Sequence, residues 1–221
     1  MKILIDDKIR EASPDLRIGI IRADVLNAPT DGELWDELIA ECDSIKQQYT
    51  QVLQINARPA IAATRSLYKA LGKDPNRYRV SSEALCRRII RGIDIYRINR
   101  LVDMINLISI RSGYAIGGFD ADNIQGETLI LGVGEADEPF EAIGRGMLNI
   151  QGLPIYRDSV GGIGTPTSDN ERTKITDTTT KIQMNINAFT QEMPLEQAME
   201  WSIELLRKYA SAENIVSFIV E

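Results

Sequence analysis

Histidine is absent from the 221-residue chain, and its absence excludes several kinds of site. A Ser-His-Asp triad, a Cys-His pair and a histidine metal site are all impossible. Only two cysteines are present, Cys42 and Cys86, too few for a disulfide framework or, without histidine, for a structural zinc site. We therefore predict no metal, no cofactor, two buried apolar cysteines and a reducing compartment.

Long apolar runs are also missing. No stretch approaches the roughly 18 residues that a membrane span needs. The first residues, MKILIDDKIREASPD, carry carboxylates where a signal peptide needs an uninterrupted apolar segment. We expect a cytoplasmic protein with no membrane partner.

Positive charge is scarce overall but concentrated in one segment. The net charge of −7 argues at first against a nucleic-acid partner. The segment Arg58–Arg111, however, contains twelve Lys/Arg and only four Asp/Glu. Such a surplus can direct a polyanion to one face of a protein, although solvated helix faces and internal ion pairs would use the same residues.

Periodicity predicts an α+β fold, with a mixed or antiparallel sheet and helices packed on it. Apolar residues at helical spacing predict helices over 30–49, 59–71, 81–92, 99–113 and from Pro194 to about residue 209. Thr30 and Ser81 are the expected caps of the first and third of these. Runs of β-branched residues predict strands over 15–26, 128–133, 155–158, 181–189 and 214–220, and 131–146 suggests a hairpin. We expect a single domain over 1–221, in which a strand and helices within 1–80 are integrated with a core over 81–190.

The glycine-rich stretch GGIGTPTSDNERTKIT, residues 161–176, does not fit the known phosphate loops. Thr167 stands where a dinucleotide fingerprint needs its third glycine, and no Gly-Lys-Ser/Thr follows at P-loop spacing. Pro166 removes an amide donor that a phosphate cradle would use. Because strand-like segments flank the stretch, we predict a loop folded against the sheet, where glycine allows a ligand to approach the backbone closely.

Several separated motifs resemble one family. INRLVDMINL (98–107) and GYAIGGFD (113–120) follow the pattern Ile-Asn-x-Val-Val-Asp-x-Thr-Asn-Tyr, then Gly-Gln-Pro-x-His-Ala-Phe-Asp. GGIGTPTSD resembles a Gly-Val-Met-Gly-Gly segment and its following Ser, and IQMNINAF (182–189) resembles an Ile-x-Leu-Glu-x-Ala-x-Phe strand. Over residues 81–189 the chain resembles the editing module of the bacterial phenylalanyl-tRNA synthetase β subunit, formed by that subunit's third and fourth domains.

The resemblance implies an α+β fold like that module, and a pocket that receives the 3′ end of a mischarged tRNA and hydrolyses the aminoacyl ester. Carried over by position, it implies a set of substrate-binding residues: Arg100, Asn106, Gly117, Gly161, Gly164, Thr165 and Asn185. Gly161 and Gly164 would form the floor of the pocket. Arg87, Arg88 and Arg91 are the expected RNA-binding residues, or else part of a solvated helix face.

Three positions depart from the family pattern. Gly117 replaces a histidine, Ile105 a threonine, and Asn185 a glutamate that senses the tyrosine hydroxyl. An amide can still bond to a hydroxyl, but the charged acceptor and the candidate proton-transfer group are gone. The identity of the catalytic residue is therefore left open.

Other residues have two possible roles each. Arg100 can line the pocket or pair with Asp103 on its own helix. Asn106 can bind a ligand or serve the helix packing. The loop residues Thr167, Ser168, Asp169 and Arg172 can bond within the loop or line the pocket mouth.

Two functions follow from these observations. The first is a free-standing aminoacyl-tRNA deacylase acting in trans, which binds the tRNA 3′ end and not DNA. It is not expected to charge tRNA, because 221 residues leave no room for further synthetase domains. The second is a non-catalytic module whose pocket holds an amino acid or another small molecule.

Overall fold

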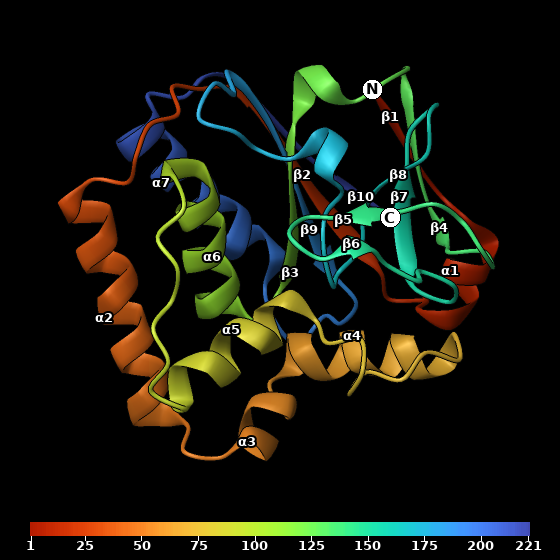
Figure 1. Cartoon of the computed structure of the whole chain (residues 1–221), viewed down its shortest axis with the longest axis horizontal. Helices are drawn as coiled ribbons and strands as arrows, with labels where there is room; N and C mark the ends of the chain where they lie inside the picture. Colours follow the sequence, from red (N-terminus) through yellow and green to blue (C-terminus); the bar gives the residue numbers. More distant parts are fainter.

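Two four-stranded sheets face each other, and a layer of helices covers the outer face of one of them (Figure 1). The computed structural model describes all 221 residues. One apolar core, which includes Ile21, Leu107 and Ile186, lies between the helices and the first sheet. A second core, which includes Ile20, Phe119 and Leu131, lies between the two sheets. The predicted α+β class is confirmed.

The first sheet has the order β10-β2-β9-β3, and every neighbouring pair is antiparallel. Its strands are β2 (Arg17–Asp24), β3 (Ala115–Asp120), β9 (Lys181–Ala188) and β10 (Glu213–Val220). Successive residues of a strand point to opposite faces, so Ile182, Met184 and Ile186 of β9 face the helices. The alternate residues Gln183 and Asn185 therefore face the second sheet. β3 is an edge strand, and its outer edge is free of strand pairing.

The second sheet has the order β1-β4-β7-β8. Its strands are β1 (Lys2–Ile5), β4 (Thr128–Val133), β7 (Pro154–Arg157) and β8 (Gly162–Gly164). β1 runs parallel to β4, and the other pairs are antiparallel. The hairpin expected within 131–146 is not formed by β4, because β4 pairs with β7; a small separate hairpin joins β5 (Glu141–Ala142) and β6 (Gly146–Met147).

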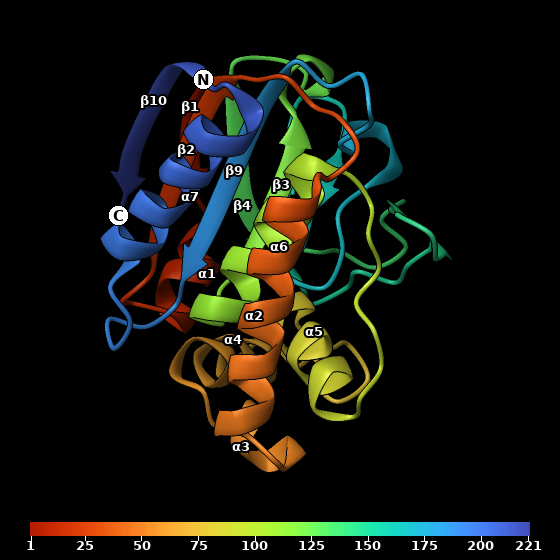
Figure 2. The same ribbon diagram turned by 90° about the vertical axis from the view of Figure 1, so that its left-hand side faces the viewer.

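Seven α-helices are present: α1 (Asp7–Ala12), α2 (Gly32–Gln48), α3 (Val52–Asn56), α4 (Pro59–Ala70), α5 (Ser81–Ile90), α6 (Arg100–Ser112) and α7 (Leu195–Ala210). α6 and α7 lie against the first sheet, and α2 packs on the outer side of α6 (Figure 2). Two 3₁₀ turns, η1 (Ala121–Asn123) and η2 (Glu171–Thr173), complete the elements. None of the helices is both long enough and apolar enough to cross a bilayer.

Two of the helix caps predicted from the sequence are not formed. Asp31, not Thr30, caps α2, because its carboxylate accepts the Leu34 N–H at 2.9 Å. α5 has no side-chain cap; the Ser81 N–H instead donates to the Pro166 carbonyl at 2.8 Å, which ties the helix to the glycine-rich loop.

α6, which carries several site candidates, is fixed at both ends. The Asn99 side chain accepts the Val102 N–H at 3.1 Å, and Gly113 ends the helix in the left-handed conformation, with φ of 83°.

Candidate functional site

A cavity of about 290 Å³ lies where α5 and α6 meet the free edge of β3, beneath the loop that follows β8. One wall is apolar and comes mainly from Ile105, Ile116 and Ile175. Residues three or four apart share one face of a helix, so Val102, Ile105, Asn106 and Ser109 of α6 all reach the cavity. A more open hollow of about 440 Å³ near Ser211 is lined by scattered charges and carries no cluster of reactive groups. The cavity beside β3 is therefore the better candidate site.

Several polar side chains at the cavity are free to meet a ligand. Asn106 lines it, and its side-chain amide makes no hydrogen bond within the chain. Ser109 contributes a hydroxyl group that likewise donates to no protein acceptor. Both groups reach the cavity, and polar groups beside an apolar wall are what a site for an amphipathic ligand needs.

Asp169 supplies the one carboxyl group that lines this cavity. Its Oδ2 accepts the Gly118 N–H at 3.2 Å, so the loop closes over the edge of β3 at this point. Burial raises the pKa of Asp169 to about 7, and the Gly118 N–H lowers it only in part. The one cation at the cavity, the ammonium group of Lys174, is 2.5 Å from Glu171 and does not neutralise Asp169. A carboxyl group that titrates near neutrality can accept or donate a proton in catalysis.

The loop after β8 is held by its own hydrogen bonds. The Thr165 hydroxyl donates to the Ser168 carbonyl at 3.0 Å and accepts the Thr167 and Ser168 N–H groups at 3.2 and 3.1 Å. Arg172 makes two contacts of 2.8 Å with Asp158. Thr165 also lines the cavity. Of the four loop residues with two possible roles, Ser168 and Asp169 line the cavity, whereas Thr167 and Arg172 do not.

Gly164 and Gly117 provide space for side chains of the chain itself. A Cβ on Gly164 would lie 2.5 Å from Asp169 Oδ1 and 2.7 Å from the Phe119 ring, and a Cβ on Gly117 would lie 2.7 Å from the same ring. The glycines therefore allow Phe119 and Asp169 to occupy the space that the sequence assigned to a ligand. Gly161 lies apart from both, with no atom within 4 Å of its would-be Cβ.

Asn185 belongs to β9, and its side chain lies on the opposite face of the first sheet from the cavity. It is fully buried, pairs in register with Gly117, and faces the second sheet. Its Oδ1 accepts from Gln183 Nε2 at 3.0 Å, and its own Nδ2 has no partner. The cavity, by contrast, is lined by Ile116 and Gly118, which point to the other face of β3.

Arg100 is also outside the cavity lining. Its guanidinium is 3.7 Å from Asp31 Oδ2, at the start of α2. The alternative pairing with Asp103 is not made, because the buried Asp103 carboxylate accepts from the Thr30 hydroxyl at 2.5 Å and from the Ile98 N–H. The structure thus brings Asn106 and Thr165 to the cavity. The other predicted substrate-binding residues do not line it: Arg100, Gly117, Gly161, Gly164 and Asn185.

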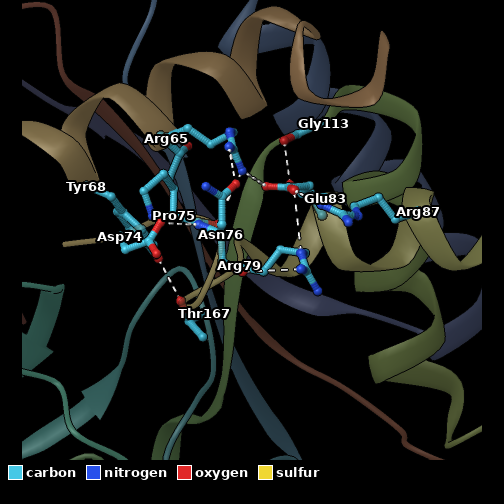
Figure 3. Close-up of polar contacts among 12 residues, drawn as sticks. Arg65, Tyr68, Asp74, Pro75, Asn76, Arg79, Glu83, Arg87, Gly113 and Thr167 are labelled. Carbon is cyan, nitrogen blue, oxygen red and sulfur yellow. Dashed lines mark hydrogen bonds and ion pairs between the residues drawn. The ribbon is translucent and has the colours of Figure 1, made fainter. Parts of the chain in front are cut away.

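Of the arginines expected to bind RNA, Arg87 belongs to a buried ion cluster (Figure 3). The carboxylate of Glu83, with no exposed side-chain surface, lies 2.8 Å from Arg65, 2.9 Å from Arg87 and 3.6 Å from Arg79. Three guanidinium groups thus share one carboxylate. Arg87 is tied to that structural cluster, and its side chain is only 14% exposed.

Arg88 and Arg91 are placed differently, because neither pairs with a carboxylate. Arg88 donates through Nε to the Asp94 carbonyl at 2.5 Å and lies over the Tyr96 ring. Arg91 follows the last turn of α5 and is exposed. Arg91 is therefore free to meet an anion, and the charge of Arg88 is not neutralised by a carboxylate.

Comparison with protein-family models finds one match, to the B3/4 domain over residues 63–209. No curated protein matches the chain. The matched range contains α5, α6, β3, the loop after β8 and therefore the whole lining of the cavity. The chain belongs to the B3/4 domain family, the domain family of the phenylalanyl-tRNA synthetase β subunit.

Proposed function

We propose that the chain hydrolyses the ester bond of mischarged aminoacyl-tRNA in trans, with the aminoacyl group bound in the cavity beside β3. The observation that carries this proposal is the pairing of an apolar wall with a carboxyl group of pKa about 7 in one cavity of the family's domain. An aminoacyl ester needs both: a surface for its side chain and a group that moves a proton near neutral pH.

In this mechanism Asp169, as the carboxylate, accepts a proton from a water molecule while the water oxygen attacks the ester carbonyl carbon. The bond between that carbon and the ribose oxygen then breaks. The proton held by Asp169 passes to the leaving ribose oxygen, so that a free amino acid and a ribose hydroxyl are formed. The unpaired amide of Asn106 and the hydroxyl of Ser109 would hold the polar atoms of the amino acid.

The amino acid selected on this proposal has an apolar side chain. Ile105, Ile116 and Ile175 offer it no hydrogen bond, and Asn185 lies on the opposite face of the first sheet. A hydroxyl placed against the apolar wall would lose its bonds to water and gain none, at a cost of about 1–3 kcal/mol. Selection of tyrosine through Asn185 is therefore not part of the proposal.

The direct test is deacylation of a panel of mischarged aminoacyl-tRNAs by the purified protein. The Asp169→Asn variant should lose most of the activity, since general base catalysis contributes about 10²- to 10⁴-fold. Asp177→Asn is the matched control, because Asp177 is an exposed carboxylate of the same loop region. For the native protein the rate should rise with pH up to about 7 and then level off, because only the ionised Asp169 accepts a proton.

Two results would contradict the deacylase proposal or replace it by a binding function. No deacylation above the uncatalysed rate for any member of the panel would reject the hydrolase. If the same protein then showed a thermal shift with a free amino acid, and the shift were lost in Asn106→Ala, the cavity would belong to a non-catalytic amino-acid-binding module.

A further inference from the structure

Tyr96 differs from the other six tyrosines of the chain, which are buried or half-buried. Tyr96 is 68% exposed. It belongs to the extended segment that joins α5 to α6, whose backbone is seen in Figure 2. A single exposed apolar side chain is ordinary on a protein surface, but an exposed aromatic ring beside guanidinium groups is the arrangement with which proteins stack on a planar ligand. The residues around Tyr96 indicate what kind of planar ligand its ring can bind.

Two segments place Tyr96 close to the mouth of the cavity. Ile98, two residues further along the chain, lines the cavity and is itself 55% exposed. Leu85 of α5 also lines it, and Arg88 lies three residues later on the same side of that helix. Arg88 in turn contacts Tyr96. The ring therefore stands beside the entrance, within reach of a molecule that enters the cavity.

Arg88 holds the ring from behind. Its guanidinium carbon is 4.3 Å from the centre of the Tyr96 ring, a cation–π distance. The same side chain donates to the Asp94 carbonyl at 2.5 Å, which fixes it to the segment that carries the ring. An aromatic ring supported on one face and exposed overall has its other face available to a planar group, at little cost in conformational entropy.

The charge around the ring favours a polyanion as the source of that planar group. Arg88 and Arg91 form no ion pair with a carboxylate, so their charge is not neutralised within the chain. Arg91 is exposed at the end of α5. Stacking on a tyrosine with arginines beside it is how proteins bind single-stranded RNA, where every base offers a ring face and each nucleotide a phosphate.

We propose that Tyr96, backed by Arg88, is a stacking platform for an unpaired base at the 3′ end of an RNA, with Arg91 near its phosphate. The identification of the RNA as tRNA rests on the proposed deacylase function, but the stacking itself does not. The platform would hold the terminal nucleotides while the aminoacyl group enters the cavity.

The test uses a short single-stranded RNA with the sequence of the tRNA 3′ end and no amino acid attached. In the full-length Tyr96→Trp variant, saturating quenching of the added tryptophan fluorescence is expected, measured against the native protein, which has Trp35 and Trp201 alone. The dissociation constant should rise about tenfold in Tyr96→Ala and stay close to native in Tyr96→Phe, which keeps the ring. Leu53→Ala is the matched control, because Leu53 is 75% exposed on α3.

Equal affinity of Tyr96→Ala and the native protein for the RNA, or no binding by the native protein, would overturn the platform. A loss in Tyr96→Phe as large as in Tyr96→Ala would also overturn it, since the hydroxyl and not the ring would then be responsible. Quenching by a peptide but not by the RNA would indicate a protein partner instead. Because the RNA carries no ester, RNA binding without deacylation would reject only the hydrolase, and deacylation unaffected by Tyr96→Ala would reject only the platform.

Discussion

Replacing Asp169 by asparagine should change the stability of the protein in a way that depends on pH. The folded-state pKa of about 7 lies above the ordinary value of 3.8, because burial disfavours the ionised carboxylate. The native state therefore holds the proton more tightly than the unfolded state does. The stability of the native protein falls as pH rises between these two values and levels off above about 7.

Between pH 5 and pH 8 this one group should lower the free energy of unfolding by roughly 2–3 kcal/mol. Asparagine has nearly the same shape, still accepts the Gly118 N–H, and cannot ionise. The free energy of unfolding of the variant should therefore rise relative to that of the native protein by this amount between pH 5 and pH 8. In urea the midpoint difference should grow by about 1 M over the same range.

The assay is urea unfolding at pH 5, 6, 7 and 8, followed by tryptophan fluorescence, with Asp177→Asn measured in parallel. A difference between Asp169→Asn and the native protein that stays constant over this range would refute the reasoning, because it would mean that Asp169 does not titrate near neutrality. A pH-independent component can add to the pH-dependent change, because the substitution also exchanges a carboxyl for an amide in the loop; only the change with pH tests the titration of Asp169.

Three further changes test other parts of the structure. Asp158→Asn should destabilise the protein by a constant amount between pH 5 and 8. Burial raises the pKa of Asp158, but hydrogen bonds from the Arg172 guanidinium and from backbone N–H groups outweigh it and leave the pKa below its ordinary value. The native protein should therefore lose its advantage over the variant only as the pH falls through that lowered pKa, measured by urea unfolding at pH 3 to 8. Glu83→Gln should cost about 3 kcal/mol in urea unfolding, because guanidinium groups lose a buried partner, whereas Glu171→Gln breaks an exposed pair and should cost less than about 1 kcal/mol. Gly164→Ala should cost about 1–3 kcal/mol and abolish the raised pKa at the cavity, read from the pH dependence of stability, while Gly32→Ala, with open space around its Cβ, should be neutral or stabilising.

Most elements of regular structure could be predicted from local patterns. The strands β2, β4, β7, β9 and β10 and the helices α2, α4, α5, α6 and α7 all lie within or close to the predicted ranges. Most of them have an apolar side that faces a core, which gives a periodic pattern, and β9, which is buried on both faces, is recognised by its run of β-branched and apolar residues.

The elements that local patterns missed depend on distant partners. β1 pairs in parallel with β4, more than 120 residues away, and no local signal encodes such a pairing. β3 contains Gly117 and Gly118 in its middle, and glycine disfavours a strand unless a neighbour needs the space. Here that neighbour is present: a Cβ on Gly118 would lie 2.3 Å from Ile105 of α6.

The site was predictable in its helix and not in its loop. Asn106 was expected from the family resemblance, and in α6 it shares a face with Val102 that lines the cavity. Asp169 stands among several polar residues in the sequence, and nothing local distinguishes it. Its raised pKa comes from burial, which only the packing of the loop on β3 creates.

The loop after β8 is attached at two points, one at its ion pair with Asp158 and one at the edge of β3 beside the cavity. Arg172 and Asp158 hold its far end by two contacts of 2.8 Å, and the Asp169 carboxylate holds its middle to the Gly118 N–H at the edge of β3. An unpaired edge amide needs a partner, and here the partner is an acid. The bond that closes the sheet edge therefore also fixes the carboxylate against the cavity. Because the Gly118 N–H holds Asp169 independently of the outer ion pair, Asp158→Asn should leave the titration of Asp169 between pH 5 and 8 unchanged.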